Sequence, residues 1–257
     1  MESGRGASAA IECRGVHKSF GDAQILAGVD LEIPQGTISV ILGPSGTGKS
    51  VLLKHVIGLL KPDRGEVVVL GQPVSRMPHD RLWGLRRKVG ILFQDGALFG
   101  SMTVYDNVAF PLRQHTDLSE QEIAGIVMQR LTDVGLSRAA ALMPGQLSGG
   151  MRKRVGFARA LVLEPPIVLF DEPDSGLDPV RTALLCQLIQ DTHEQQGGTY
   201  VIITHDILSA RRIGSFIALL WRGKVVKSGP DREMWESEDP FVRQFLQGNS
   251  LGPLGMD

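Results

Sequence analysis

The side chains most suited to chemistry lie in a glycine-rich segment that can hold phosphate groups. Residues 43–50 read Gly-Pro-Ser-Gly-Thr-Gly-Lys-Ser, and their glycines let the backbone curl until successive N–H groups point at an anion. Lys49 can then reach the β- and γ-phosphates, and the Ser50 hydroxyl can ligate Mg²⁺. The pattern predicts ATP or GTP binding. The residues expected to hold the nucleotide are Gly43, Pro44, Ser45, Gly46, Thr47, Gly48, Lys49, Ser50 and Val51.

Two acidic residues directly follow a second apolar segment. Residues 167–170 are Ile-Val-Leu-Phe, and Asp171 and Glu172 come next. Because open α/β sheets bind ligands at the carboxyl ends of their strands, we expect these acids beside the phosphates. Asp171 is expected to support a bound Mg²⁺ ion, and Glu172 to orient and polarise the water that attacks the γ-phosphorus.

Strands and helices in a fixed order must position these residues. The run 37–42 is expected to deliver the phosphate loop from a buried strand, and 50–57 to continue it into a helix whose N-terminus favours phosphate. The other core strands predicted are 89–93, 167–170 and 200–204. Alternating patterns over 11–16 and 29–33, with 66–70, predict a small antiparallel layer. The sequence therefore predicts an α/β fold.

A second glycine-rich helix start occurs about a hundred residues after the first. Leu147 precedes Ser148, Gly149 and Gly150, and Ser148 can cap a helix that begins near Gly149. The N–H groups and the positive end of the helix dipole would then face outward, toward an anion. Because two glycines in a first turn weaken a helix, the pair also predicts close approach of another backbone.

With these segments in order, residues 11–246 resemble the nucleotide-binding subunit of ATP-binding cassette (ABC) transporters. The resemblance implies a P-loop NTPase ABC ATPase fold with a RecA-like core sheet and an N-terminal antiparallel β subdomain. It also implies an α-helical subdomain inserted at about residues 95–163. The implied substrate is ATP with Mg²⁺, and the implied activity is ATP hydrolysis coupled to transport.

The resemblance assigns roles to further single residues. Phe20 lies where the family stacks an aromatic ring on adenine, and Gln94 lies where a glutamine contacts Mg²⁺ and the attacking water. His205 matches the switch histidine that contacts the γ-phosphate, and Asp178 belongs to the loop 175–178 that crosses the dimer interface. The family works as a dimer packed head to tail, so Ser148, Gly149 and Gly150 are expected to contact the ATP of a second copy.

Position 151 distinguishes this chain within the family, because Met151 stands where a glutamine is usual. Met151 and residues 170–182 resemble the ATPases of Mce-protein lipid transporters, especially the actinobacterial type, and the related Gram-negative group that maintains outer-membrane lipid asymmetry. This implies membrane permease subunits and an Mce-domain lipid-binding protein as partners. Three alternatives remain open: an importer of small polar solutes, a soluble ABC ATPase, and a nucleotide-dependent scaffold that does not hydrolyse ATP.

Composition and charge restrict the kinds of partner. The formal net charge is −1 and the isoelectric point about 6.6, which gives no electrostatic footprint for nucleic acid. No apolar run approaches the roughly 20 residues that span a bilayer, so a peripheral protein at the cytoplasmic side of the membrane is expected. Residues 1–10 lack a hydrophobic signal region and are expected to be disordered. Cys13 and Cys186 have apolar neighbours and are expected to be buried.

Two segments have uses that the pattern leaves open. Residues 94–112 carry Leu98, Phe99, Met102 and Tyr105 among turn residues, which favours a groove for the membrane partner over packing within the chain. Ser119 and Glu122 form a capping box before an apolar helix stripe that is expected to be core. The stripe is Ile123, Ile126, Val127, Leu131 and Val134.

The C-terminus is expected to form two short helices, 231–235 and 240–246, followed by a tail of residues 247–257. Three large aromatic residues there, Trp235, Phe241 and Phe245, require burial. The tail can pack on its own domain or reach across to the other subunit, and the sequence leaves both open.

Overall fold

The computed structural model describes residues 8–254 of the chain. Two compact units make up the fold. Unit 1 contains Met1–Pro78 and Ile203–Asp257, and unit 2 contains His79–Ile202. Each unit contributes strands and helices, in keeping with the predicted α/β class.

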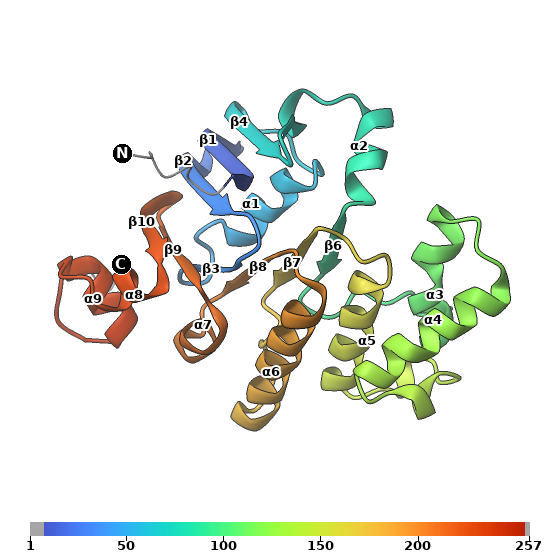
Figure 1. The fold of residues 1–257 in the computed structure, drawn as a ribbon. Helices are drawn as coiled ribbons and strands as arrows, with labels where there is room; N and C mark the ends of the chain where they lie inside the picture. The colour runs from blue at the N-terminus through green and yellow to red at the C-terminus, as the bar shows by residue number, and fades with distance from the viewer. Residues whose placement is uncertain (1–7, 255–257) are drawn as a thin grey trace, which may run out of the picture. The chain divides into compact units, whose positions relative to one another are not determined.

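Unit 1 contains an antiparallel sheet with the strand order β2-β1-β4-β5 (Figure 1). Its strands are β1 (Ala9–Phe20), β2 (Ala23–Pro34), β4 (Arg64–Val69) and β5 (Gln72–Pro73). Val16 pairs with Val29, and both side chains are fully buried, so the alternating pattern gives the sheet an apolar face. The predicted antiparallel layer is confirmed. The expected disorder of residues 1–10 is wrong for Ala9 and Ala10, which belong to β1, while residues 1–7 lie outside the described residues.

Three further strands of unit 1 have the order β10-β9-β3, namely β3 (Ile38–Leu42), β9 (Phe216–Trp221) and β10 (Lys224–Pro230). β3 and β9 run parallel, and β9 and β10 form an antiparallel pair. All five residues of β3 are buried, as expected for a strand covered on both faces. Helices α1 (Lys49–Val56) and α7 (Ile207–Ile213) follow β3 and β8 in the chain.

The C-terminal part of unit 1 forms α8 (Asp231–Trp235) and α9 (Pro240–Gln247), as predicted. The ring of Phe241 lies 5.6 Å from the ring of Trp221, and the guanidinium of Arg211 lies over the Trp235 ring. After α9 the chain turns back, and the backbone N–H of Leu254 donates to Gln244 Oε1 at 2.7 Å. Residue 254 of the tail therefore packs on its own unit.

Unit 2 contains three strands in the order β8-β7-β6, namely β6 (Val89–Leu92), β7 (Ile167–Asp171) and β8 (Thr199–Thr204). The last two residues of β8 belong to unit 1. Two helices, α5 (Gly149–Leu161) and α6 (Pro179–Gln196), contact these strands through aromatic rings. Phe157 of α5 and Tyr200 of β8 both lie against Phe170 of β7. His193 of α6 meets Tyr200 edge to face at 5.0 Å. The core of unit 2 lies around these rings.

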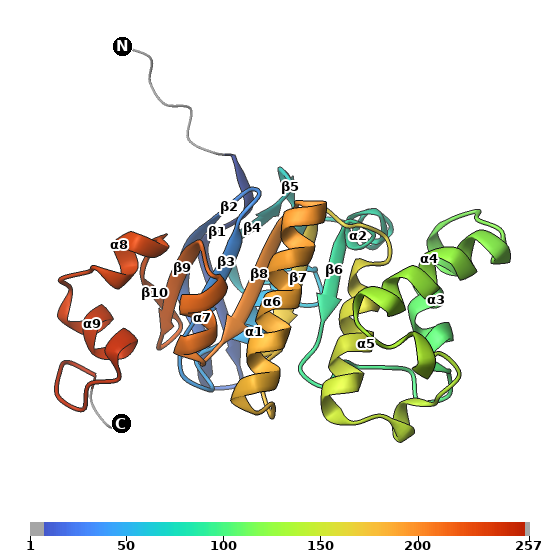
Figure 2. The same cartoon turned by 60° about the horizontal axis from the view of Figure 1, so that its bottom comes forward.

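The helices of unit 2 are α2 (His79–Arg86), α3 (Val104–His115), α4 (Glu120–Asp133), α5 (Gly149–Leu161) and α6 (Pro179–Gln196) (Figure 2). The capping box of Ser119 and Glu122 is present at the start of α4. Most of the predicted apolar stripe is buried, and only Ile126 is half-buried. Within the described residues, short 3₁₀ turns span Ser137–Ala139 and Pro144–Gln146 in unit 2, and Val74–Arg76 in unit 1.

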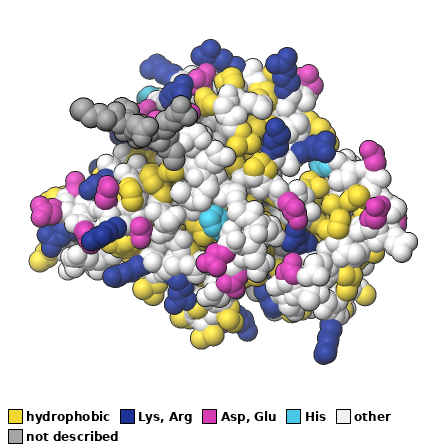
Figure 3. All heavy atoms as spheres, in the orientation of Figure 1, with side chains coloured by type: hydrophobic (Ala, Val, Ile, Leu, Met, Phe, Trp, Pro, Cys, Tyr) yellow, Lys and Arg dark blue, Asp and Glu magenta, His cyan; other side chains and the backbone are white. Residues whose placement is uncertain are grey.

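Basic and acidic side chains are interspersed over the face shown in Figure 3. No helix within residues 8–254 is both long enough and apolar enough to cross a membrane. Cys13 and Cys186 are both buried, as expected.

Candidate active site

The phosphate loop follows β3 and contains glycines of two kinds. Gly46 and Gly48 have positive φ angles of 81° and 98°, a region that other residues rarely adopt. Gly43 has an ordinary φ but lies so close to β9 that a Cβ atom would come within 2.3 Å of the Leu220 carbonyl oxygen. The loop therefore requires glycine at these positions for turning and for packing within unit 1.

The start of α1 lies at the end of the phosphate loop. Its N-cap residue is Gly48, and no side chain accepts a hydrogen bond there. By contrast, Thr103, Ser119, Ser148, Asp178, Asp206 and Asp239 cap the helices that follow them. Because the first N–H groups of a helix need acceptors and carry the positive end of its dipole, the α1 start suits phosphate oxygens.

Lys49 is buried and its ammonium group bends back over the loop. Its Nζ donates to the carbonyl oxygens of Gly43 and Pro44, at 2.7 and 2.8 Å. The Thr47 hydroxyl also donates to the Pro44 carbonyl, at 2.9 Å. These bonds hold the loop closed around a positive charge, which suits an anionic ligand. Ser50, the predicted Mg²⁺ ligand, is half-buried in the first turn of α1.

Phe20 and His205 are the other predicted site residues of unit 1. Phe20 ends β1, its ring is 49 % exposed, and the ammonium of Lys18 lies 5.5 Å from its centroid. An exposed ring at a strand end can stack on a flat heterocycle. His205 is exposed in the bend between β8 and α7, where Asp206 caps α7 by accepting from the N–H of Leu208.

The predicted acids lie at the carboxyl end of β7 in unit 2. Asp171 is the last residue of the strand and is half-buried, whereas the four residues before it are fully buried. Glu172 follows in a left-handed backbone conformation with φ of 46°. Such a conformation is uncommon for a residue with a side chain and persists when the surrounding structure enforces it.

The second glycine-rich helix start differs from the first. Ser148 is exposed and caps α5, because its hydroxyl accepts from the N–H of Met151 at 3.3 Å. A Cβ atom on Gly149 would meet nothing closer than 3.8 Å, and one on Gly150 nothing closer than 3.6 Å. Among residues 8–254, a Cβ atom at either glycine would therefore make only ordinary van der Waals contacts.

Asp178 has a structural use that the motif alone did not reveal. Its carboxylate caps α6 by accepting from the N–H groups of Val180 and Arg181, at 3.0 and 2.9 Å. The bond from the Arg181 N–H is the main cause that lowers the pKa of Asp178 below 3.8, and the Arg181 guanidinium contributes too. Asp178 therefore caps α6, and its part in nucleotide binding stays a prediction.

The loop after β6 carries Gln94, which is exposed. Gly96, two residues later, lies so close to α5 that a Cβ atom would come within 2.8 Å of the Arg152 carbonyl oxygen. Arg159 of α5 donates to the carbonyls of Gly96 and Ala97, at 2.8 and 2.9 Å. The loop that presents Gln94 is thus fixed to α5.

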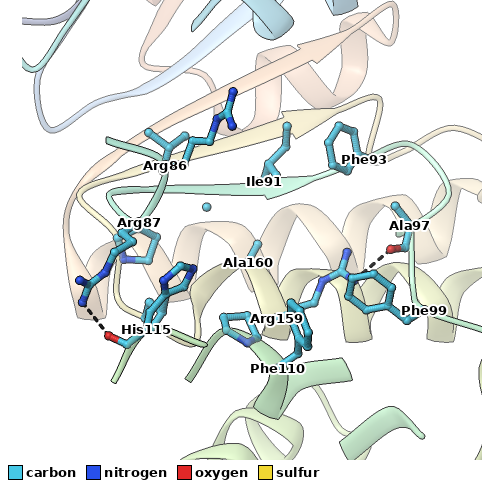
Figure 4. Close-up of a pocket in the computed structure, with 15 residues that line it drawn as sticks. Arg86, Arg87, Ile91, Phe93, Ala97, Phe99, Phe110, His115, Arg159 and Ala160 are labelled. Atoms are coloured by element: carbon cyan, nitrogen blue, oxygen red, sulfur yellow. Dashed lines mark hydrogen bonds between the residues drawn. The ribbon is translucent and has the colours of Figure 1, made fainter. Parts of the chain in front are cut away.

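A groove of about 310 Å³ opens beside this loop, within unit 2 (Figure 4). The rings of Phe99 and Phe110 lie 4.9 Å apart, and the Arg159 guanidinium lies over the Phe99 ring. At the other end, Arg87 donates to the His115 carbonyl at 2.7 Å. The groove contains aromatic surface and arginines, which suits a protein segment with apolar and acidic or carbonyl groups.

Lys153 is a residue that motif reading missed. The sequence showed it as the middle of a basic run, but its side chain is buried beneath the turn that follows β7. Helical spacing could have indicated this, because positions 153, 156, 157 and 160 share one face of α5 and all are buried.

The predicted site residues therefore form two sets. Unit 1 holds the phosphate loop, Phe20 and His205. Unit 2 holds Gln94, the acids of β7, the Ser148 helix start and Asp178. The first set can bind a phosphate chain and a base, and the second supplies carboxylates and a further helix start.

Comparisons with known proteins agree with this chemistry. The sequence pattern of the ABC transporter family matches residues 26–175. The chain is 53 % identical over 247 residues to the Mycobacterium leprae protein described as probable ribonucleotide transport ATP-binding protein mkl, covering 96 % of this chain and 71 % of that one. It is 41 % identical over 244 residues to the Escherichia coli intermembrane phospholipid transport system ATP-binding protein MlaF, covering 95 % and 91 %.

Solved structures extend the likeness to three dimensions. A dimeric bacterial ABC transporter cassette matches with a TM-score of 0.81 at 35 % identity, over 86 % of this chain and 99 % of that one. A dimeric ATP-binding cassette in a post-hydrolysis state with ADP and Pi matches with a TM-score of 0.80, also at 35 % identity. The predicted P-loop ABC ATPase fold is confirmed, and the chain belongs to the ABC transporter family as one of its ATPases.

Proposed function

We propose that this protein hydrolyses ATP at two sites of a homodimer and thereby drives a membrane transporter of lipids. The observation that carries the ATP-binding part is the α1 start, where a glycine-rich loop, a buried lysine and a helix N-terminus without a side-chain cap occur together. This combination suits a polyphosphate better than any protein side chain.

The hydrolytic step follows from the chemistry of the two acids and the lysine. A water oxygen attacks the γ-phosphorus, the bond to the β,γ-bridging oxygen breaks, and ADP and inorganic phosphate leave. Glu172 accepts a proton from the water, while Lys49 and His205 offset the charge on the γ-phosphate oxygens. These residues orient the water and the phosphates.

The candidate Mg²⁺ ligands have suitable chemistry. Ser50, Gln94 and Asp171 offer a hydroxyl, an amide carbonyl and a carboxylate, and Mg²⁺ prefers such oxygen ligands. When bound, the ion neutralises phosphate charge and fixes the orientation of the phosphates. We therefore propose these three side chains as its protein ligands.

We also propose that Ser148, Gly149 and Gly150 contact the ATP held by a second copy. The fit of a Cβ atom at both glycines supports this, because no contact within the described residues requires the absence of side chains there. Dimeric cassettes of the same fold support it as well. Asp178, at the start of α6, would then lie near the dimer interface.

Membrane permease subunits are the proposed partners at the groove of unit 2. The aromatic pair of Phe99 and Phe110, with Arg159 and Arg87, offers both an apolar and a cationic surface to an inserted segment. The protein would then be peripheral, at the cytoplasmic side of the membrane. An Mce-domain lipid-binding protein is proposed as a further component.

Two candidates exist for the transported molecule. The name of the MlaF relative refers to phospholipid, whereas the name of the mkl relative refers to ribonucleotide. Met151 and residues 170–182, which resemble lipid-transporter ATPases, favour lipid. Ribonucleotide, a small polar solute, is the second candidate because the mkl relative has the higher identity of the two.

The proposed domain organisation accompanies this function. We propose that residues 11–246 form the ATPase domain, with a helical subdomain at about 95–163. Residues 247–257 are proposed as a tail that also contacts a second copy. The tail contact is testable, because truncation after Leu246 should weaken dimer formation. An unchanged dimer would leave only the contact with Gln244.

One experiment tests the proposal and separates its alternatives. The Glu172→Gln protein is isolated with ATP from its native membranes, and co-purifying chains and lipids are identified by mass spectrometry. A permease with an Mce-domain protein and lipid supports the proposal. A soluble solute-binding protein would favour the ribonucleotide alternative, and no membrane partner would favour a soluble ATPase. Phosphate release by the unaltered protein separates an ATPase from a non-hydrolysing scaffold.

A further inference from the structure

The turn after β7 must be held in an unusual shape. Glu172 has a φ of 46°, and the turn continues through residue 176. Its own backbone bonds are long, from the Ser175 N–H to the Glu172 carbonyl at 3.2 Å and from the Leu177 N–H to the Asp174 carbonyl at 3.1 Å. An uncommon backbone conformation persists when neighbouring groups enforce it.

Lys153 of α5 supplies such groups from beneath the turn. Its Nζ donates to the Pro173 carbonyl at 2.9 Å, to the Ser175 carbonyl, and to the Ser175 hydroxyl at 3.2 Å. The Glu172 carbonyl lies 3.5 Å away, at the outer limit of a hydrogen bond. The three protons of one ammonium therefore serve acceptors on successive parts of the turn.

The Lys153 side chain is buried among carbonyl and carboxylate groups. The side chain is 5 % exposed, and its burial lowers the pKa of the ammonium group. The carboxylates of Asp174, Asp95 and Glu172 oppose that effect and favour the charged form. A buried charge is strongly unfavourable unless it is paired and hydrogen-bonded. The Lys153 ammonium therefore needs the acceptors of the turn, and the turn needs the donors of Lys153.

The same helix also fixes the loop that carries Gln94. Gly156 of α5 lies so close to Gly96 that a Cβ atom on Gly156 would come within 3.1 Å of the Gly96 Cα, and Arg159 donates to the Gly96 carbonyl. α5 begins at the capping residue Ser148. One rigid helix thus connects a glycine-rich helix start, the Gln94 loop and the Glu172 turn.

From these contacts we propose that Lys153 is a positioning residue, which holds the Glu172 turn on α5 so that the Ser148 helix start and the hydrolytic carboxylate move together. The role in turnover rests on the proposed function. Lys153 touches the backbone of the turn and the Ser175 side chain, and it acts on the reaction through the placement of Glu172.

The test compares Lys153→Met with Arg154→Met in the full-length protein. Arg154 is the matched control, because it is the next residue of α5 and its guanidinium donates at 2.8 Å to the Val134 carbonyl, away from the turn. Lys153→Met should lower kcat for ATP about 10- to 100-fold while the KM for ATP changes less than about 3-fold, since small misplacements of a reacting group reduce rates by such factors. Arg154→Met should change kcat less than about 3-fold.

Amide hydrogen exchange gives a readout that does not depend on catalysis. Lys153→Met should speed exchange at residues 172–177 at least about 10-fold and leave β7 and α4 unchanged, because only the turn loses its donors. Unchanged exchange at residues 172–177 would overturn the inference, whatever the ATPase rate. So would equal kcat losses in the two variants.

The two proposals fail in different ways. If the unaltered protein and Arg154→Met release no phosphate from ATP, the proposed function is wrong, and the positioning role in turnover is wrong with it. If both turn over normally and Lys153→Met does as well, only the positioning role is overturned.

Discussion

The two glycine-rich helix starts of this protein look alike in sequence and differ in structure. At α1, Gly48 has a left-handed conformation with φ of 98°, and a Cβ atom on it would come within 2.8 Å of Leu26 Cδ2. At α5, a serine caps the helix, and both glycines that follow have room for a Cβ atom. The first start has no side-chain cap and the second has one.

This difference indicates whether each glycine is required by packing within its own chain or by something outside it. The phosphate-loop glycines are needed by the fold of their own unit, for a turn at Gly48 and a close approach to β9 at Gly43. Gly149 and Gly150 are not required by any contact within residues 8–254. If the pair is functional, the requirement comes from outside the chain, which agrees with a contact across a dimer.

The largest expected effect is at the α1 start. Lys49→Ala should weaken ATP binding about 100-fold or more, because charge-assisted bonds to phosphate are among the strongest hydrogen bonds in proteins. Lys54→Ala, on an exposed position of the same helix, is the control and should bind ATP normally. Titration with a fluorescent ATP analogue measures both. Equal affinities would remove the α1 start as the ATP site.

The next-largest expected effect is on stability, where substitutions of Gly48 and Gly149 should differ. Gly48→Ala should lower the free energy of unfolding by about 2 to 3 kcal/mol, because alanine is strained at this φ and meets Ile25 and Leu26. Gly149→Ala should change it by less than about 1 kcal/mol in either direction, since alanine favours a helix and finds open space. Urea denaturation measures both. Equal destabilisation would contradict the comparison.

Activity should reveal a role for Gly149 that stability does not. Gly149→Ala is expected to reduce ATP turnover by the dimer about 10-fold, because an added methyl group displaces an approaching phosphate from the backbone donors. The same variant should bind ATP with unchanged affinity at the α1 start. Phosphate release under saturating ATP measures the effect. Full turnover would show that no ligand approaches Gly149.

A smaller effect is expected from removal of the α5 cap. Ser148→Ala should lower the free energy of unfolding by about 0.5 to 1 kcal/mol, in the lower part of the usual range for caps because the bond to the Met151 N–H is 3.3 Å long. Ser119→Ala, which breaks a complete capping box in α4, is the comparison and should have at least as large an effect. No change in either variant would indicate that these caps do not stabilise their helices.

The smallest effect concerns the pH dependence of the α6 cap. Because folding lowers the pKa of Asp178 below 3.8, its charge stabilises the fold above that pH, and the contribution is lost as pH falls through the folded pKa. Asp178→Asn should therefore lower Tm slightly at pH 7, with the difference from the unaltered protein vanishing as pH falls through the folded pKa of Asp178. A difference that grows on acidification would contradict this sign. Asp22→Asn, in the turn between β1 and β2, is the control.

Much of the local structure could be predicted from the sequence. The buried strands β3, β6, β7 and β8, the capping box of α4 and the two C-terminal helices were all predicted, with boundaries that differ by at most three residues. α2 was missed, because its polar composition lacks a strong helical period. β1 begins at Ala9 and not at Ile11, because small residues such as Ala9 and Ala10 give no alternating signal.

The candidate site was predicted with less detail. The motifs identified the phosphate loop, the acids and the second helix start. They did not reveal that Asp178 caps α6, that Glu172 adopts a left-handed conformation, or that Lys153 is buried. The Asp178 cap is local and helical spacing indicates the burial of Lys153, whereas the turn at Glu172 is held by Lys153, which is 19 residues away in the chain.

By itself the sequence determined the class of chemistry and the order of the elements, because glycine, lysine and paired acids at fixed spacing have few other uses. Tertiary structure decided which glycines are obligatory. Gly43 is required because β9, 177 residues away at Leu220, lies beside it, whereas Gly149 and Gly150 have room for a Cβ atom. The physical reason is that packing within a fold depends on neighbours distant in the chain, while turns, caps and charge depend on neighbours close to it.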